Sequence, residues 1–259
     1  MKKLKLMAAI LFIMAGQTYA QATYPLNDVA NPKQECYAFI HATIVKDPQT
    51  TLQNATLVIR KSRIEAVGSD IKVPADAVVI DCKNKWIYPS FIDIYSDYGV
   101  QTGKGGSGEG YRSRTQMLSN TKGAYGWNQA IRSETDAVRI FSVDETKAKD
   151  LRSVGFGTVL TQLMDGISRG TGAMVTLNNE KENLAIVKER AAAGYSFKKG
   201  SSTQDYPGSL MGSIALLRQN YLDAEWYKTK PAGEGVNISL QAFLNNLDLP
   251  QIFDADDVW

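Results

Sequence analysis

The pattern of hydrophobic and polar positions divides the chain into a strand-rich front and a mixed remainder. Between residues 37 and 81, short runs rich in β-branched and aromatic residues are separated by polar turns, which is typical of β-strands. Four short strands bury little core by themselves, so this unit is expected to pack on something else. The strands are expected at residues 37–45, 55–60, 63–67 and 77–81, with a tight turn at Lys61-Ser62.

From residue 86 onward the pattern predicts helices alternating with strands. The clearest helix covers residues 209–226, where Leu210, Ile214, Leu217 and Tyr221 recur at helical spacing. A helix at 144–154, with Ser142 as a possible cap, precedes a buried strand at 158–164, and this order is the repeat of an α/β barrel. Residues 183–197 fit either a helix or a strand. The remaining expected elements are a short strand at 173–177, a helix at 240–247, a strand at 250–253 and the start of a helix after it.

A long polar stretch at about 99–150 interrupts this alternation and is interpreted as an insertion. Loops of this length in compact domains are usually functional or disordered. Its glycine-rich part at 103–110 matches G-x-G-x-x-G by letter, but no helix follows closely, which favours a flexible loop over a dinucleotide site. Tyr125 and Trp127 lie in the insertion, where they suggest an aromatic surface for a sugar or a peptide.

Residues 1–20 have the features of a secretory signal peptide. Lys2, Lys3 and Lys5 precede an apolar run at 6–15, and small residues before Gln21 suit a signal peptidase. An uncleaved membrane anchor is the alternative. We expect an exported protein, periplasmic or extracellular, that has no membrane segment after cleavage.

Charge and cysteine content narrow the classes of partner. The whole chain has a formal net charge of +2, and removal of the three leader lysines leaves 26 basic against 27 acidic residues. A near-neutral protein has no electrostatic footprint for nucleic acid, so none is expected as a partner.

Export permits a disulfide between Cys36 and Cys82, and two unpaired buried thiols are the alternative.

Several phrases in residues 37–97, and one further along the chain, resemble the amidohydrolase superfamily. They are RIEAVG at 63–68, VID at 79–81 followed by Lys85 (with Asn84 where glycine is usual), and GFGTV at 155–159. The resemblance implies an α/β fold: an N-terminal arm and small β-sandwich at 21–85, then the first part of a (β/α)8 TIM-type barrel at 86–259. The barrel is expected to be truncated at residue 259.

The run KWIYPSFIDIYSD at 86–98 resembles the first barrel strand of that family without its two metal-binding histidines. The positions are occupied by Tyr95 and Asp97, and the single histidine of the chain, His41, lies in an apolar strand where a packed or surface role is expected. The resemblance implies metal-activated hydrolysis of C–N bonds. This segment is therefore expected to be catalytically degenerate and scaffold-like, with no cofactor of its own.

Two other possibilities for chemistry follow from the sequence. Asp97 is a candidate ligand for a hard cation, and a zinc-like divalent metal is expected in a full-length protein, held by a C-terminal portion or a partner chain. Alternatively, the segment is a non-catalytic ligand-binding module that uses the insertion and the loop at 165–172. Within that loop Asp165, Arg169 and Thr171 are candidate ligand contacts, unless Asp165 and Arg169 simply pair with each other.

Overall fold

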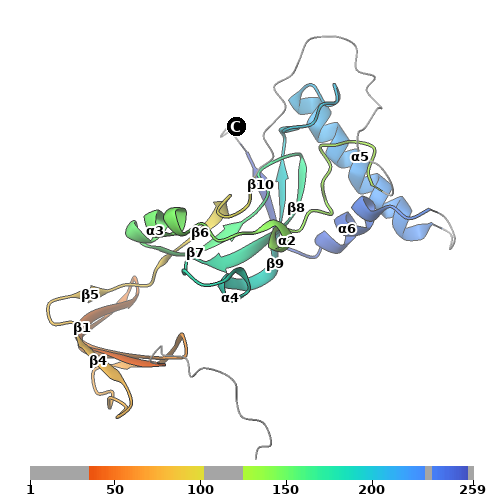
Figure 1. Cartoon of the computed structure of the whole chain (residues 1–259). Coiled ribbons are helices and arrows are strands. Elements are labelled where there is room, and N and C mark those ends of the chain that lie inside the picture. The colour runs from red at the N-terminus through yellow and green to blue at the C-terminus, as the bar shows by residue number, and fades with distance from the viewer. Residues whose placement is uncertain (1–34, 102–124, 231–234, 256–259) are drawn as a thin grey trace, which may run out of the picture. The chain divides into compact units, whose positions relative to one another are not determined.

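The computed structural model describes residues 35–101, 125–230 and 235–255, and the chain divides into two compact units, Met1–Pro89 and Ser90–Trp259 (Figure 1). The expected signal peptide, the arm up to residue 34 and the glycine-rich stretch at 103–110 lie outside the described residues. So does most of the helix expected after residue 253.

The strands of the first unit form one five-stranded sheet, whereas a small β-sandwich was expected. The strands are ordered β3-β2-β1-β4, and β5 also pairs with β1. The register of β1 shifts around His41, whose φ is 59°, and the residues before and after this point pair with β4 and β5 in turn. His41 itself is exposed and contacts Asp81, so it is a surface residue. The strands are β1 (Cys36–Asp47), β2 (Thr50–Arg60), β3 (Arg63–Gly68), β4 (Val78–Asp81) and β5 (Trp86–Ile87).

The turn between β2 and β3 has the conformation that a two-residue hairpin requires. Lys61 and Ser62 both have positive φ, 48° and 61°, which matches the twist of the flanking strands. The sheet buries residues on both faces: Leu57 belongs to one apolar cluster and its neighbour Val58 to another. Period-two alternation in the sequence therefore corresponds to two packed faces.

The two cysteines are buried and unbonded. Cys36 begins β1, whereas the backbone N–H of Cys82 donates to the carbonyl of Ile40, four residues further along β1. At the rise of a β-strand this offset is about 13 Å, beyond the roughly 7 Å that a disulfide can bridge. The structure therefore shows two unpaired buried thiols, which was the alternative to a disulfide.

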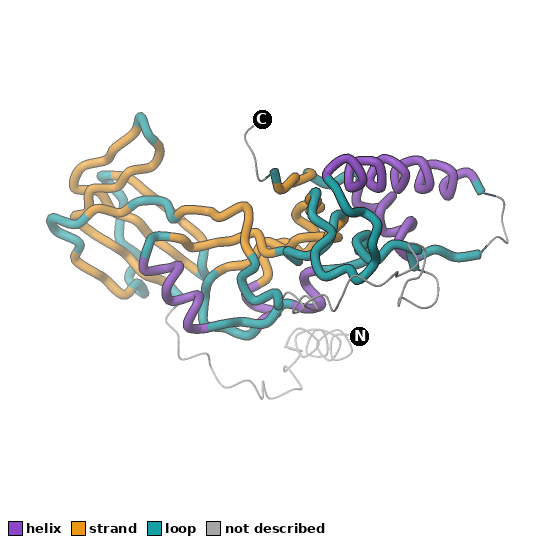
Figure 2. Tube along the Cα trace, turned by 90° about the horizontal axis from the view of Figure 1, so that it is seen from above, coloured by secondary structure: helices purple, strands orange, loops and turns teal. Residues whose placement is uncertain are grey.

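The second unit is a mixed α/β arrangement around a curled five-stranded sheet ordered β10-β9-β8-β7-β6 (Figures 1 and 2). Strand β8 runs antiparallel to both neighbours, while β6 pairs in parallel with β7 and β9 with β10. The elements are β6 (Phe91–Ser96), α2 (Ala137–Ile140), α3 (Glu145–Ser153), β7 (Phe156–Thr161), β8 (Ser168–Thr176), α4 (Glu182–Ala185), β9 (Ile186–Ser196), α5 (Leu210–Thr229), α6 (Ile238–Asn246) and β10 (Gln251–Asp254).

Helices cover the outer face of this sheet, and the inner face carries a smaller apolar cluster. On β7, Val159 packs outward against residues of α2, α3 and α4, while the next residue, Leu160, packs inward with Ala192 and Ile252. Further along the outer face, the β9 residue Tyr195 packs against α5 and α6. The unit is therefore a half-barrel in section, with a helical layer outside and a concave interior.

Two local expectations are corrected, and one open alternative is decided. Residues 168–172, predicted as part of a loop, belong to β8, because Gly166 and Gly170 adopt positive φ and let the chain turn back immediately after β7. The helix at 145–153 is capped by Asp144, whose side chain accepts from the Lys147 N–H, and not by Ser142. The ambiguous segment is mainly a strand, β9, preceded by the four-residue helix α4.

The strongest periodic patterns are confirmed. The predicted helices correspond to α5 and α6, which begin at the caps Ser209 and Asn237, and the predicted strand at 250–253 corresponds to β10. Helices α5 and α6 pack together beside β9. Within the described ranges, none of the helices combines the length and the apolar character needed to cross a bilayer.

Candidate functional site

Three polar side chains from β6, β8 and β10 meet on the curled sheet. Arg169 Nη1 donates to the Tyr95 hydroxyl at 2.9 Å, and Nη2 donates to Asp254 Oδ2 at 3.0 Å. The Arg169 side chain is 5 % exposed and the Asp254 side chain 20 %. We call Tyr95, Arg169 and Asp254 the Arg169 cluster.

The Arg169 cluster joins the two edges of the sheet. Tyr95 is on β6 and Asp254 on β10, which are four strand spacings apart, or about 19 Å if the sheet were flat. Both side chains nevertheless contact the same guanidinium, which belongs to the central strand β8. Only a strongly curled sheet brings side chains from both edge strands to one guanidinium. The Arg169 cluster therefore lies inside the curve of the half-barrel, between its two edges.

The electrostatics of the cluster keep Asp254 ionised and Tyr95 neutral. Burial raises the pKa of Asp254, but hydrogen bonds from Tyr95 and Arg169 outweigh it, and the pKa lies below its ordinary value. Burial raises the pKa of Tyr95, and the neighbouring Asp254 raises it further against the opposing effect of Arg169. The cluster is thus a guanidinium–carboxylate pair with a protonated phenol beside it.

The Arg169 side chain has further contacts, and Gln162 and Gly194 lie close beside it. Arg169 Nε donates to the Gly166 carbonyl at 3.2 Å, and Nη1 also lies 3.5 Å from Met164 Sδ. Beside it, Gln162 is 1 % exposed and its Oε1 has no hydrogen-bond partner. Gly194 on β9 leaves the space for this amide, because a β-carbon there would collide with Gln162 Oε1.

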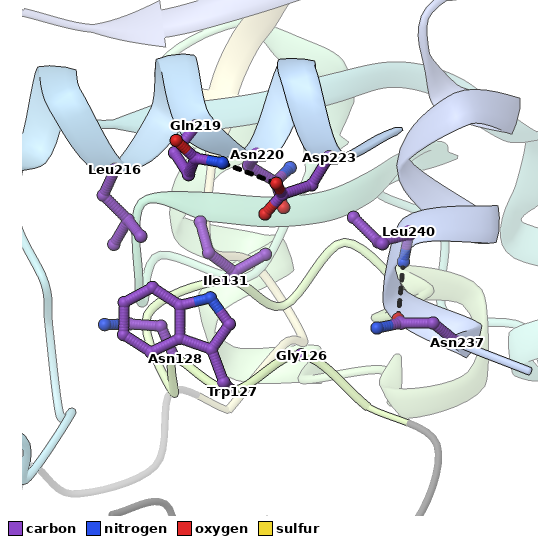
Figure 3. A pocket seen from close by; sticks show the side chains of 10 residues that line it. All are labelled: Gly126, Trp127, Asn128, Ile131, Leu216, Gln219, Asn220, Asp223, Asn237 and Leu240. Atoms are coloured by element: carbon purple, nitrogen blue, oxygen red, sulfur yellow. Dashed lines mark hydrogen bonds between the residues drawn. The ribbon is translucent and has the colours of Figure 1, made fainter. Parts of the chain in front are cut away.

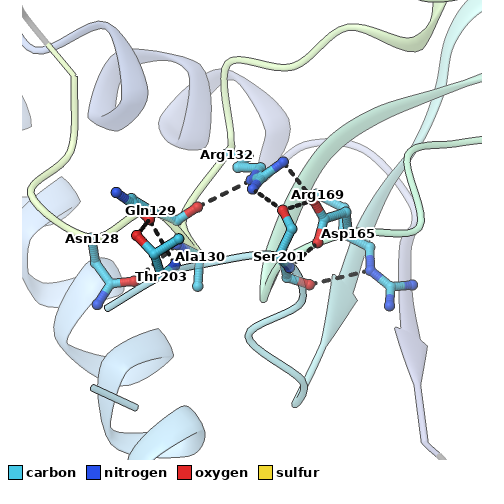
Figure 4. Close-up of polar contacts among 9 residues, drawn as sticks. Asn128, Gln129, Ala130, Arg132, Asp165, Arg169, Ser201 and Thr203 are labelled. Carbon is cyan, nitrogen blue, oxygen red and sulfur yellow. Dashed lines mark hydrogen bonds and ion pairs between the residues drawn. The ribbon is translucent and has the colours of Figure 1, made fainter. Parts of the chain in front are cut away.

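Asp165 belongs to a separate network and does not pair with Arg169 (Figure 4). Its carboxylate pairs with Arg132 at 2.6 Å and accepts from the backbone N–H and the hydroxyl of Ser201 at 2.6 and 2.5 Å. Arg132 also donates to Ser201 Oγ and to the Gln129 carbonyl. Asp165 is 2 % exposed, so it fastens the insertion to the loop after β9 and is not presented to a ligand.

The other predicted site residues also have protein partners. Thr171 is buried and its hydroxyl donates to Asp136. Asp165, Arg169 and Thr171 therefore each have a different protein partner. Asp97 is exposed and pairs with Lys147 of α3 at 2.7 Å. Across the described ranges there is no group of three or more His, Cys, Asp or Glu residues placed to hold a metal.

Sequence reasoning missed Asp254 as a site residue and missed the role of Tyr95 as an arginine partner. The sequence places Asp254 after a buried strand, which is where barrel site residues occur. That position could have marked it as a candidate. Its partner could not be found in the same way, because Arg169 lies 85 residues away in the chain.

Replacement of Arg169 by methionine should lower the free energy of unfolding by about 3 kcal/mol, because it leaves the Asp254 carboxylate partly buried without its cation. The double variant R169M/D254L should cost less than the sum of the two single variants, with a coupling of at least about 1 kcal/mol. Chemical denaturation measures both. The matched control K147M removes only an exposed ion pair and should cost less than about 1 kcal/mol. Additive single-variant effects would contradict the cluster.

The contribution of Asp254 should depend on pH in one direction. A carboxylate whose pKa is lowered by folding stabilises the protein above its unfolded value of about 3.9, and this contribution disappears as the pH falls through the lowered pKa. The difference in unfolding free energy between wild type and D254N should therefore be largest near pH 7 and shrink below about pH 4. Denaturation curves at pH 7, 5, 4 and 3 test this, with D97N as the surface control. A difference that grows in acid would contradict it.

Comparison with known proteins places the fold. A crystal structure of an amidohydrolase from Thermotoga maritima MSB8 matches 86 % of this chain with a TM-score of 0.63 at 17 % sequence identity, and the match covers 58 % of that protein. This chain therefore spans little more than half of the solved amidohydrolase. No protein-family profile matches the sequence.

Curated relatives match a shorter stretch. Dihydroorotases from Anaeromyxobacter sp. (strain K) and Anaeromyxobacter dehalogenans (strain 2CP-C) are 33 % and 34 % identical to it over 58 residues. This is 22 % of the present chain and 13 % of each dihydroorotase. In its fold, and in the sequence of that stretch, the chain resembles the amidohydrolase superfamily.

Proposed function

We propose that this chain is the N-terminal part of an exported amidohydrolase-family protein that hydrolyses C–N bonds, and that the segment described here is itself a catalytically inactive scaffold. The observation that carries this proposal is the guanidinium of Arg169 bound to Tyr95, the residue at the first metal-ligand position of the resemblance. A divalent metal in the full-length protein would then be held by residues outside this segment.

The charge of the cluster argues against a metal at this place. Arginine stays protonated at all relevant pH values, so a divalent cation next to Tyr95 would face a fixed positive charge. Burial raises the pKa of Tyr95, which favours the neutral phenol, a poor ligand. Asp97, at the second ligand position, has an ammonium partner in Lys147. The charge of Arg169, the neutral phenol of Tyr95 and the ion pair of Asp97 therefore all argue against a metal centre here.

The edges of the sheet support an incomplete barrel, although the antiparallel strand β8 departs from the all-parallel strands of a TIM-type barrel. In the part of the chain that the structure describes, β6 and β10 each pair on one side only. Phe91, Ile92 and Ile94 on β6 are 64 %, 56 % and 64 % exposed, although unpaired apolar edge strands are a hazard that native proteins usually cover. We infer that further barrel strands, from a C-terminal portion or a partner chain, pack on this edge.

The alternative, a ligand-binding module without catalysis, has support in only one of its two proposed segments. Asp165 and Thr171 are buried and fully engaged, which argues against the segment at 165–172 as a ligand loop. The described end of the insertion does line a pocket of about 400 Å³, to which Tyr125, Arg132 and Thr203 contribute. A binding role for the insertion is therefore the part of this hypothesis worth retaining.

The metal content of engineered variants tests the scaffold proposal. After dialysis against Zn²⁺ and desalting, elemental analysis should find no stoichiometric zinc in the wild-type chain or in Y95H/D97H, because Arg169 still supplies the opposing charge. The triple variant Y95H/D97H/R169M should gain zinc, since it restores the two imidazoles of the resemblance and removes the guanidinium that pairs with the Asp254 carboxylate.

The control Y95F/D97N/R169M removes the same charge without adding imidazoles and should stay free of zinc. Circular dichroism verifies that each variant is folded. Stoichiometric zinc in the wild-type chain, or in Y95H/D97H with Arg169 intact, would sink the proposal.

Export is tested by expression with the native N-terminus in a Gram-negative host. The periplasmic fraction should contain a protein whose first residue by N-terminal sequencing is Gln21. Ala20→Arg should block this processing, because signal peptidase requires a small residue there. Recovery of an intact chain starting at Met1 in the membrane fraction would show an uncleaved anchor instead.

A further inference from the structure

A small cavity lies between the described end of the insertion and the outer helices α5 and α6 (Figure 3). Its volume is about 40 Å³. None of its lining residues belongs to the Arg169 cluster or to the Asp165 network, so it is a distinct feature of the outer layer. It is lined by Gly126, Trp127, Asn128, Ile131, Leu216, Gln219, Asn220, Asp223, Asn237 and Leu240.

The cavity contains a buried hydrogen-bond donor that the protein does not satisfy. Asn220 is 6 % exposed, and its Nδ2 has no hydrogen-bond partner. An unsatisfied buried donor is costly, and native proteins keep few of them. The cavity is therefore built to receive an acceptor from outside the protein.

The walls indicate what kind of acceptor fits. Around Asn220, the side chains of Ile131, Leu216 and Leu240 are apolar, so the group that accepts from Nδ2 should carry an apolar neighbour. A carbonyl bonded to a methyl has this form. The volume exceeds the 10–15 Å³ that one water needs, so a small group can enter.

Two residues at the opening extend this match. Asp223 accepts one hydrogen bond from Gln219 at 2.6 Å, and a carboxylate has further capacity to accept an amide N–H. Trp127 lies across the cavity from α5 and is 38 % exposed, while its ring stacks on Tyr206 at 6.2 Å and is thereby held in place. An exposed indole is suited to the apolar side of a sugar ring.

We propose that this cavity binds the acetamido group of an N-acetylated hexosamine. Its carbonyl oxygen accepts from Asn220 Nδ2, its methyl packs against Ile131 and Leu216, and its N–H donates to Asp223. The sugar ring remains at the opening against Trp127. The site is independent of the proposed scaffold role and involves no bond-making step.

Protein-observed NMR on the mature chain tests the proposal with N-acetylglucosamine, glucose and N-acetylalanine amide as probes. N-acetylglucosamine should give saturable shifts, and glucose should bind at least about tenfold more weakly, because it leaves Asn220 without its acceptor. Binding of N-acetylalanine amide as tight as that of the sugar would overturn the assignment to a hexosamine.

Asn220→Leu should weaken binding of N-acetylglucosamine at least about tenfold while the melting temperature stays the same or rises, because an unpaired buried amide is replaced by an apolar side chain of similar size. Asn183→Leu, at an exposed position away from the cavity, is the matched control and should bind normally. Trp127→Ala should also weaken binding, which keeps the test decisive if Asn220→Leu does not fold. The absence of saturable binding would show a cavity for water only, and unchanged binding in both cavity variants would show that the sugar binds elsewhere; either result overturns the proposal.

Discussion

The curl of the second unit depends on one buried guanidinium. Arg169 lies on the central strand, and its two terminal nitrogens hold the hydroxyl of Tyr95 and the carboxylate of Asp254 from opposite edges of the sheet. Because a buried charge left without its partner is costly, loss of any one of these side chains should destabilise the others. The space beside the guanidinium is small. The buried Gln162 amide fits there because Gly194 has no β-carbon.

The same interaction relates the fold to function. A metal-activated hydrolase needs deprotonated ligands around an open position, whereas the inner face here presents a paired arginine, a neutral phenol and a carboxylate with a lowered pKa. Gln162 Oε1 beside the guanidinium and Asn220 Nδ2 in the outer helical layer both lack a hydrogen-bond partner, and Asn220 lines a cavity. The charged groups of the Arg169 cluster are therefore paired with each other, and the proposed ligand site lies in the outer layer.

Prediction from the sequence succeeded where local physics decides the outcome. The β2–β3 hairpin and helix α5 follow from period-two and helical patterns together with a tight turn and a serine cap. It was undecided or wrong where contacts with distant residues determine the structure. The alanine-rich part of β9 favours a helix by propensity, yet Ala192 and Ala193 pack on opposite faces of a sheet. In β8, Gly172 suggested a loop but permits close approach to Leu160.

The sequence by itself determined the resemblance to amidohydrolases, the loss of the histidine pair at Tyr95 and Asp97, and most of the elements, because these depend on residue identity and short-range periodicity. Only the tertiary structure decided which side chains Tyr95 and Asp97 contact. It also decided that Asp165, Arg169 and Thr171 have separate partners, and that Asn220 faces a cavity. These pairings join residues far apart in the chain, and sheet curvature and helix packing, which create them, leave no local pattern in the sequence.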